Sequence, residues 1–586
     1  MNPGEYTVDV TGMQPMKVAV TLSETEITDI KSLEQNETKG IADEALTSFP
    51  KQIVESQDLT IDAVSNATIT SNAIIEGVKL AIQKAGGNPE AFGEVTGTIK
   101  FEPGTYEGVA EGHNGQVKAA VEFSGDKILS VKIIESDETE HLSDVVYEQL
   151  PKAIIEEQSL NVDTVTGATV TSMAVKKAIG EAVKEAGGNP ELLNKVSPKE
   201  LSTEVKELTT DVVVVGGGSA GISAALTSEQ AGHKVILIEK NAMYGGHTAL
   251  SGGWTLITGS KIQKDLGVTN DTPELAFDDV MANGGNNSDP ELLQIFVDNM
   301  GAAADWTVDY VGAEIPDSLK VLPENQVDRA LVYTGGGKGI SDALVAKMNE
   351  TEIQQYLNTK AEELIIENDE IVGVVAKAKD GTTYKIKADS VVLATGGHGA
   401  RRDLLGESLD SFVYYGAALA SGDGLDLGQS VGGDIIDMSF VELFENGVEW
   451  KPGIAKSTFN GSMAAWEAGG ILVDRNGNRV VNEKGMGPDI VAQQAKQEDA
   501  RLFIFMDQAT FTKFRENIGG YGISEQMLDG WLENNGKVKP YFAHGQTVDE
   551  TAGILNINAE NLKATMERYN KFVENGLDED FGRDPE

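Results

Sequence analysis

Residues 211–240 read DVVVVGGGSAGISAALTSEQAGHKVILIEK, a run that leaves fewer possible folds than any other part of the chain. An apolar stretch enters the pattern Gly216-x-Gly218-x-x-Gly221, which a helical pattern and a second apolar stretch follow. Gly216 suits a tight turn after a strand, Gly218 lets a pyrophosphate approach the helix N-terminus, and Gly221 allows close helix–strand packing. Glu239, 18 residues past Gly221, is placed to accept hydrogen bonds from ribose hydroxyls. The run therefore predicts an adenine-dinucleotide site on a Rossmann-type domain.

Three more glycine-rich segments favour FAD over NAD as that dinucleotide. Residues 241–254 (NAMYGGHTALSGGW) follow the ribose acid directly, and such a loop brings backbone close to the flavin ribityl chain and ring. Residues 389–400 (DSVVLATGGHGA) read as a strand with an Ala-Thr-Gly-Gly turn, and residues 420–433 place Asp423 in a turn that heads a helix. The predicted FAD-binding residues are Gly216, Gly218, Ser219, Ala220, Gly221, Glu239, Lys240, Gly245, Gly246, His247, Thr248, Gly253, Ala394, Thr395, Gly396 and Asp423.

Residues 1–90 and 101–191 are two copies of one unit, at an offset of about 101 residues. The first ends in IQKAGGNPE and the second in VKEAGGNPE, which indicates a tandem duplication. In the second copy, residues 115–136 alternate apolar and polar residues around a Gly-Asp turn, which predicts two strands of an α+β unit. Two helical patterns follow, and we expect Thr171 or Ser172 to cap the second helix.

The composition excludes several classes of function. A net charge of −46 argues against nucleic acid and anionic membrane surfaces as partners, because both attract basic proteins. The absence of cysteine excludes disulfides, iron–sulfur ligation and c-type haem attachment. No apolar run reaches the roughly 18 residues of a membrane helix, so we expect no membrane insertion. The six histidines lack metal-pair spacing, so we expect no metal site; His247 and His398 would approach a flavin or serve a structural role.

The FAD-site segments also resemble a known family. VVVVGGGSAG, ILIEK, GGHTALSGG, LATGG and SGDG are similar, in that order, to the FAD-binding pattern of the soluble fumarate reductase and flavocytochrome c group. GGILVDRNGNRVVNE at 469–483 resembles the start of the clamp domain of that group, and TMERYNKFVENG at 565–576 resembles the helix near its end. The resemblance covers residues 209–586 and implies an FAD-dependent oxidoreductase with a clamp, or capping, domain.

The N-terminal repeats resemble the FMN-binding domain of flavin-carrying subunits of membrane redox complexes. That domain binds FMN through a phosphoester to the last threonine of the pattern Asp-x-x-(Ser/Thr)-x-Ala-Thr. The matches here are DAVSNAT, which ends at Thr68, and DTVTGAT, which ends at Thr169; Asn66 stands where the second copy has Gly167. The resemblance implies two covalent FMN groups and a flavin transferase to attach them. The alternative is that NATITS and GATVTS are ordinary helix caps.

The chain departs from the fumarate reductases at the residues that carry their chemistry. Gly487 falls where the resemblance places a general-acid arginine, and Met463 and Trp466 fall where it places a proton-delivering glutamate and arginine. A substrate-binding His-Pro-Thr is absent from residues 439–450. Glycine cannot replace a proton donor, so the fumarate chemistry is not carried over. Candidate groups facing the flavin, each with a core or surface role as its alternative, are Tyr333, Tyr414, Tyr415, Arg401 and Arg402.

These features predict an α/β multidomain flavoprotein that passes electrons from an upstream donor through FMN to FAD, and on to a small unsaturated organic acceptor. Alternatives are an electron-carrier module without turnover and an enzyme like the ketosteroid dehydrogenases. The resemblance implies an extracellular or cell-surface location, with a cytoplasmic one as the alternative, and about a hundred further residues of the FAD domain. The expected domains are FMN-binding units at 1–96 and 97–195, a linker at 196–208, a Rossmann-type FAD-binding domain at 209–443 and an α+β clamp at 444–586.

Overall fold

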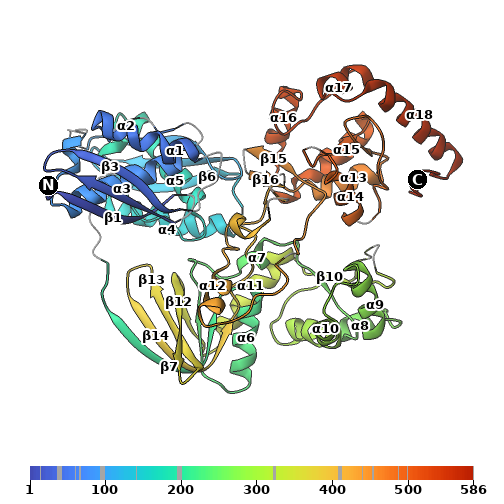
Figure 1. The fold of residues 1–586 in the computed structure, drawn as a ribbon, viewed down its shortest axis with the longest axis horizontal. Coiled ribbons are helices and arrows are strands. Elements are labelled where there is room, and N and C mark those ends of the chain that lie inside the picture. Colours follow the sequence, from blue (N-terminus) through green and yellow to red (C-terminus); the bar gives the residue numbers. More distant parts are fainter. Residues whose placement is uncertain are drawn as a thin grey trace.

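The structure is a computed structural model, drawn in Figure 1. In that view the two repeats lie together at the upper left, the large sheet lies below them, and the C-terminal region lies at the upper right. Among the described residues, no helix combines the length and the apolar character needed to cross a bilayer. The structure describes all residues except 13–14, 36–41, 60, 62, 65–66, 93–98, 140, 194–200, 321, 323–324, 407–408, 410–411, 439, 452–453, 486, 498 and 585–586.

Each repeat is a three-stranded antiparallel sheet with helices packed on one face. The strands alternate buried and exposed residues, as a half-buried sheet requires, and the buried ones meet the long helix of the same repeat. The first repeat contains β1 (Gly4–Thr11), β2 (Pro15–Leu22), β3 (Ile27–Gln35), α1 (Asp43–Thr47), α2 (Phe49–Ser56), α3 (Thr68–Lys84) and η1 (Pro89–Phe92). The second contains β4 (Gly104–Glu111), β5 (Gln116–Phe123), β6 (Ile128–Ser136), α4 (Leu142–Glu157), α5 (Thr169–Glu185) and η2 (Pro190–Leu192).

A six-stranded sheet in the order β11-β8-β7-β14-β13-β12 forms the centre of the third unit. Its first four strands are parallel, with α6 as the crossover from β7 to β8, which is the predicted Rossmann arrangement. The strands and their crossover helix are β7 (Val205–Val215), α6 (Ser219–Gln230), β8 (Val235–Ile238), β11 (Gln354–Tyr356), β12 (Thr359–Glu367), β13 (Glu370–Ala378) and β14 (Thr383–Leu393).

The strand β7 begins at Val205, inside the segment expected to be a linker and six residues before Asp211. Its first half is largely exposed and carries alternating charges, so it lacks an apolar signal. Pairing with β14 makes it a strand, because Val205 lies opposite Thr383 and Leu208 opposite Ile386. Local composition does not reveal a strand whose partner lies so far along the chain.

Insertions on the sheet carry a small helical layer, seen at the lower right of Figure 1. Its buried Arg329 binds two carboxylates, Asp271 at 2.7 Å and Asp279 at 2.6 Å, which ties β10 to α9 and to the turn before it. The remaining elements of this unit are α7 (Gly246–Leu250), β9 (Trp254–Leu256), α8 (Lys261–Asp265), α9 (Pro273–Asn283), α10 (Pro290–Asp309), β10 (Ala330–Val332), α11 (Gly336–Asn349), η3 (Arg402–Leu404) and α12 (Asp423–Ser430).

The C-terminal region is mainly helical, with two short antiparallel strand pairs, β15-β16 and β17-β18. Among its described residues, three apolar clusters hold it together: one around β17, β18 and α18, one around α15 and α16, and a smaller one of Trp466, Leu472, Val481 and Ile490. Its elements are β15 (Val448–Lys451), β16 (Ile454–Lys456), α13 (Phe459–Glu467), β17 (Ile471–Val473), α14 (Gly487–Gln494), β18 (Phe503–Phe505), α15 (Gln508–Asn517), η5 (Ile518–Tyr521), α16 (Glu525–Asn534), α17 (Val548–Ile554) and α18 (Ala559–Asn575).

Candidate functional site

The first glycine-rich loop joins β7 to α6, and its glycines have different surroundings. An added Cβ atom at Gly216, whose φ is +108°, would lie 2.3 Å from the carbonyl oxygen of Ala394. At Gly221 it would lie 1.9 Å from the carbonyl oxygen of Gly216, whereas at Gly218 the nearest atom, the carbonyl oxygen of Gly245, would be 4.0 Å away. Gly216 and Gly221 therefore permit close backbone packing, and Gly218 borders open space.

The N-terminus of α6 is suited to an anion. Gly218 is its N-cap residue and offers no side chain to the backbone N–H groups of the first turn, among them those of Ala220 and Gly221. Ser219 opens the helix and accepts a hydrogen bond from the Thr248 hydroxyl at 2.8 Å. Uncapped N–H groups and the positive end of the helix dipole favour a pyrophosphate, so this loop fits the predicted FAD.

Glu239 follows the carboxyl end of β8 and is held by two backbone amides. Its Oε2 accepts a hydrogen bond from the N–H of Gly217 at 2.7 Å, and its Oε1 accepts one from the N–H of Asn241 at 2.8 Å. Burial raises the pKa of Glu239, and the two amide hydrogen bonds oppose that rise. The carboxylate is thereby fixed beside the first glycine-rich loop, where the sequence pattern expects a partner for the ribose.

The second glycine-rich loop packs directly on the first. The N–H of Gly245 donates to the carbonyl oxygen of Gly217 at 2.8 Å. An added Cβ atom at Gly246 would lie 3.4 Å from the Cα atom of Gly218. The two loops therefore form one surface of closely spaced backbone beside the open N-terminus of α6.

A further glycine run, TGGGKG at 334–339, belongs to the same surface and is not among the predicted FAD-binding residues. An added Cβ atom at Gly253, whose φ is +73°, would lie 2.4 Å from the carbonyl carbon of Gly336. One at Gly337 would lie 2.0 Å from the carbonyl oxygen of Thr248. The run opens α11. Glycines directly before a helical pattern were therefore the sequence signal that could have identified this run as part of the site.

Lys240 and Asp423 join the end of β8 to the first turn of α12. Lys240 Nζ donates to Asp423 Oδ2 at 2.6 Å, and Lys360 Nζ lies 3.4 Å from Asp423 Oδ1. Burial acts to raise the pKa of Asp423, but the two ammonium groups outweigh it and hold that pKa at about 2. An added Cβ atom at Gly424 would lie 2.2 Å from Thr395 Oγ1, so the turn after β14 packs on α12 as well. The predicted segments meet at the carboxyl ends of the strands, where α/β sheets bind ligands.

Two groups of side chains expected to face the flavin are engaged elsewhere. Tyr333 lies in the apolar core, with its hydroxyl 2.8 Å from Thr307 Oγ1. Arg401 pairs with Asp403 at 2.9 Å, and Arg402 donates to a backbone carbonyl. Arg401 also pairs with Asp426 of α12 at 3.1 Å, so it lies beside a segment of the predicted FAD site, whereas Tyr333 lies in the core.

Three other candidates lie close to the glycine-rich surface. Tyr414 donates from its hydroxyl to the carbonyl oxygen of Ala417 at 3.1 Å, and His247 Nε2 lies 3.3 Å from the same oxygen. Burial raises the pKa of Tyr414 and lowers that of His247, so burial favours the neutral form of each. The Cβ atom of His398 lies 3.3 Å from where a Cβ atom at Gly422 would be, next to α12.

The predicted attachment residues Thr68 and Thr169 are each the first residue of a long helix, α3 and α5. Their N-cap residues are alanines, so neither helix has a side-chain cap. The expected cap in the second repeat is wrong, because α5 begins before Thr171 and Ser172. Thr171 bonds to Glu138, and Ser172 accepts from the N–H of Val165 at 3.0 Å and donates to the carbonyl of Ala168 at 2.9 Å. Thr169 is half-buried at an uncapped helix N-terminus, where a phosphate is favourable.

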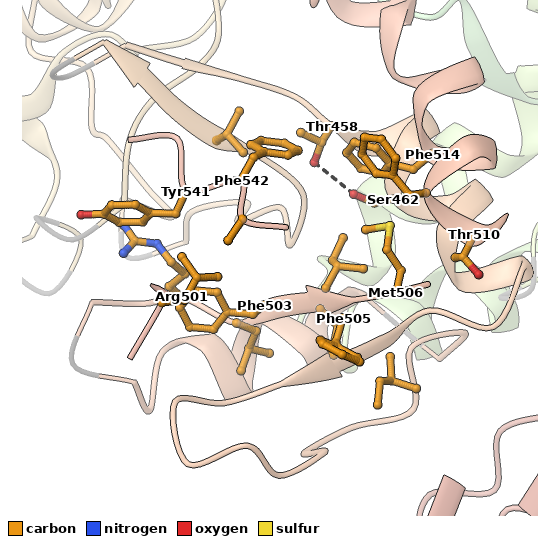
Figure 2. A pocket seen from close by; sticks show the side chains of 18 of the residues that line it. Thr458, Ser462, Arg501, Phe503, Phe505, Met506, Thr510, Phe514, Tyr541 and Phe542 are labelled. Atoms are coloured by element: carbon orange, nitrogen blue, oxygen red, sulfur yellow. Dashed lines mark hydrogen bonds between the residues drawn. The ribbon is translucent and has the colours of Figure 1, made fainter. Parts of the chain in front are cut away.

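The C-terminal region contains a cavity of about 1500 Å³, shown in Figure 2. Its lining is mixed: it includes aromatic side chains, among them Phe503 and Phe505 on β18 and Phe514 on α15, and charged ones such as Glu449, Asp507 and Lys539. Polar groups are few in the view: the Thr458 and Ser462 hydroxyls bond to each other at 3.0 Å, and Arg501 stacks on the Tyr541 ring at 5.0 Å. The aromatic part of this lining suits the apolar part of an organic molecule.

Glu483, at the end of the GGILVDRNGNRVVNE stretch, has a structural role. It is buried and accepts hydrogen bonds from Arg479 at 2.8 Å, from Arg583 at 2.9 Å and from the backbone N–H of Leu472 at 2.9 Å. Gly487, by contrast, opens α14, and an added Cβ atom there would lie 2.8 Å from Glu445 Oε2. Position 487, where the resemblance to the fumarate reductases places an arginine, therefore faces a carboxylate.

Known protein families match the chain in agreement with this geometry. The family described as FAD binding domain matches residues 211–586, and the one described as FMN-binding domain matches residues 12–83 and 112–184. The urocanate reductase of Eggerthella lenta is 29% identical over 525 residues, which are 88% of this chain and 84% of the relative. The NADH:acrylate oxidoreductase of Vibrio harveyi is 26% identical over 550 residues, which are 82% of this chain and 53% of the relative. The chain thus spans about half the length of that second relative.

A solved structure of similar fold is the open conformation of a flavocytochrome c3 fumarate reductase. It is 28% identical to the chain, the match covers 64% of each chain, and the TM-score is 0.50.

Proposed function

The chain is an FAD-dependent oxidoreductase of the fumarate reductase type and belongs to the family that shares this FAD binding domain, and we propose that it reduces a small unsaturated organic acid. Electrons would reach its FAD through two FMN groups, and residues 444–586 would serve as the clamp domain. The observation that carries the proposal is the open, uncapped N-terminus of α6 at Gly218, surrounded by the other glycine-rich segments.

FAD supplies hydride transfer when bound, and the chain's own residues supply its binding and orientation. The first turn of α6 would hold the pyrophosphate, Glu239 the adenosine ribose, and the backbone of the second loop the ribityl chain and ring. The pair Lys240–Asp423 fixes two of these segments relative to each other. The neutral Tyr414 hydroxyl, near the same surface, is the candidate proton donor.

The surroundings of Gly487 favour a substrate other than fumarate. A dicarboxylate needs several cationic partners, whereas a carboxylate, Glu445, faces position 487. The named relatives reduce acrylate and urocanate, which each carry a single carboxylate. A monocarboxylic enoate with an apolar or aromatic substituent would place that substituent against the aromatic side chains of the C-terminal cavity.

The two FMN groups would be esterified to Thr68 and Thr169 by a flavin transferase, at an extracellular or cell-surface location. The support is that both threonines open uncapped helices in domains of the FMN-binding family. The intact mass of the chain, made together with a flavin transferase, should show two FMN additions, and Thr68→Val and Thr169→Val should each remove one. A wild-type chain without added mass would contradict covalent attachment.

A further inference from the structure

The loop that ends at Thr169 is docked on the FAD-binding unit. The N–H of Ala242 donates to the carbonyl oxygen of Thr166 at 3.2 Å, and Lys379 Nζ donates to the carbonyl of Thr164. Ala242 lies in the second glycine-rich loop, three residues after the ribose carboxylate Glu239, and Lys379 lies in the turn between β13 and β14. The attachment loop of the second repeat therefore contacts the segment expected to hold FAD.

The shape of the attachment loop matches this contact. Gly167 has φ of +89°, and an added Cβ atom there would lie 3.0 Å from Asn241 Oδ1. Val165 and Ala168 belong to one apolar cluster with Ala242 and Met243 of the FAD-binding unit. A residue with a side chain at position 167 would be strained and would press on Asn241, which explains why a glycine stands there.

His141 makes a second connection between the same two units. Its Nε2 lies 2.8 Å from the carbonyl oxygen of Tyr244, and because a carbonyl only accepts, Nε2 must carry the hydrogen. His141 also starts α4, where its backbone N–H donates to Asp144 Oδ2 at 3.1 Å. An added Cβ atom at Gly245 would lie 2.9 Å from His141 Nε2, so the imidazole reaches the second glycine-rich loop itself.

A third connection ties the second repeat to the C-terminal region. Lys456 Nζ donates to Asn114 Oδ1 at 2.7 Å and to the carbonyl oxygen of Gly522 at 2.8 Å. The second repeat is thus bound both to the FAD-binding unit and to the C-terminal region, which indicates that its position is fixed.

The first repeat lies together with the second at the upper left of Figure 1. Burial raises the pKa of Glu76 on α3, while the nearby Lys176 of α5 lowers it and Asp163 raises it further. Burial likewise lowers the pKa of Lys176 to about 8, against the attraction of Glu76 and Asp163. Lys176 Nζ also donates to the carbonyl oxygen of Val162, so the residue of α5 that interacts with Glu76 of α3 lies at the start of the attachment loop of the second repeat.

Resting on the proposed function, we infer that the second repeat alone hands electrons to FAD, that the first repeat feeds the second, and that His141 is a positioning residue of this relay. Thr68 would hold the flavin that gives up two electrons, and Thr169 would hold the flavin that receives them. The residues of the proposed FAD site would hold the final acceptor of these two electrons, and the accompanying protons would exchange with water. Dithionite, a low-potential inorganic reductant, can stand in for the unidentified donor.

Distances between flavins test the order directly on the full chain. Thr68→Val and Thr169→Val each leave FAD with one FMN, and partial reduction with dithionite produces one-electron-reduced flavins whose dipolar coupling measures their separation. The coupling should be stronger, and the separation shorter, in Thr68→Val than in Thr169→Val. Equal separations, or a shorter one in Thr169→Val, would overturn the order. A wild-type chain that carries no added FMN mass would instead overturn the proposed function, in which FMN is attached to the chain.

The positioning role of His141 is tested in the Thr68→Val background. His141→Asn tolerates the positive φ of 71° but is too short to reach Tyr244, so the distribution of separations should broaden. His141→Gln keeps an N–H donor and should restore the narrow distribution, and His233→Asn, on an exposed turn, is the matched control. An unchanged distribution in His141→Asn, with both flavins bound, would rule the role out.

Discussion

Lys240 Nζ lies 2.6 Å from Asp423 Oδ2, although 183 residues separate the two along the chain. Lys240 follows Glu239 at the end of β8, and Asp423 opens α12. The side chains are only 26% and 18% exposed, so the pair is partly shielded from water. It therefore holds two segments of the proposed FAD site at a constant separation.

Lys240→Met should lower the free energy of unfolding at pH 7. It should also make this free energy depend less on pH in the acid range. The folded-state pKa of Asp423, about 2, lies below the ordinary 3.8, so this stabilisation is present above pH 3.8 and is lost as pH falls toward 2. The shift corresponds to about 2 kcal/mol, of which Lys360 retains a part in the variant. Urea unfolding of the wild type and of Lys240→Met between pH 7 and pH 3 measures the free energy of unfolding of each protein. A difference in this free energy that stays the same over that pH range would refute the prediction.

Gly218→Ala and Gly221→Ala form a matched pair of changes in one loop. The new methyl group at 218 enters open space and should leave the melting temperature of the flavin-free chain unchanged while weakening FAD binding. The methyl group at 221 would lie 1.9 Å from the Gly216 oxygen and should destabilise the fold itself. Thermal unfolding and fluorescence titration with FAD separate the outcomes. Normal FAD affinity in Gly218→Ala would place the pyrophosphate elsewhere.

Glu483→Gln should destabilise the C-terminal region by about 3 kcal/mol, because two buried arginines lose their shared anionic partner. Glu467→Gln removes an exposed carboxylate that pairs with Lys484 and is the control, with an expected effect of under about 1 kcal/mol. Urea unfolding followed by tryptophan fluorescence compares them. Equal stabilities would show that the buried network does not hold this region together.

Tyr333→Phe should cost about 1 kcal/mol of stability, since it removes one buried hydrogen bond to Thr307. It should leave the rate of flavin reoxidation by an accepted enoate unchanged, because the hydroxyl lies in the core. Stopped-flow absorbance at the flavin band provides the measurement. A large loss of rate at unchanged stability would restore Tyr333 as a proton donor.

Sequence patterns predict the features that are local. The strand, turn and helix around Gly216–Gly221 follow from residues close together in the chain, as do the helices that start near Thr68 and Thr169. Contacts between distant segments do not: the first half of β7 depends on β14, and Gly167 depends on Asn241 of another unit. The wrong cap in the second repeat has a similar cause, since Thr171 is turned toward Glu138, a partner outside its helix.

The central claim is that the chain delivers electrons from its flavins to an unsaturated acid. The most direct measurement reduces the complete, flavin-loaded protein with dithionite under anaerobic conditions and mixes it with acrylate, urocanate, an aryl-substituted enoate or fumarate. The account predicts rapid return of the oxidised flavin absorbance with at least one monocarboxylic enoate, and a slower return with fumarate. Flavins that stay reduced with every enoate would contradict this claim. They would favour the alternative that the chain is an electron carrier without turnover.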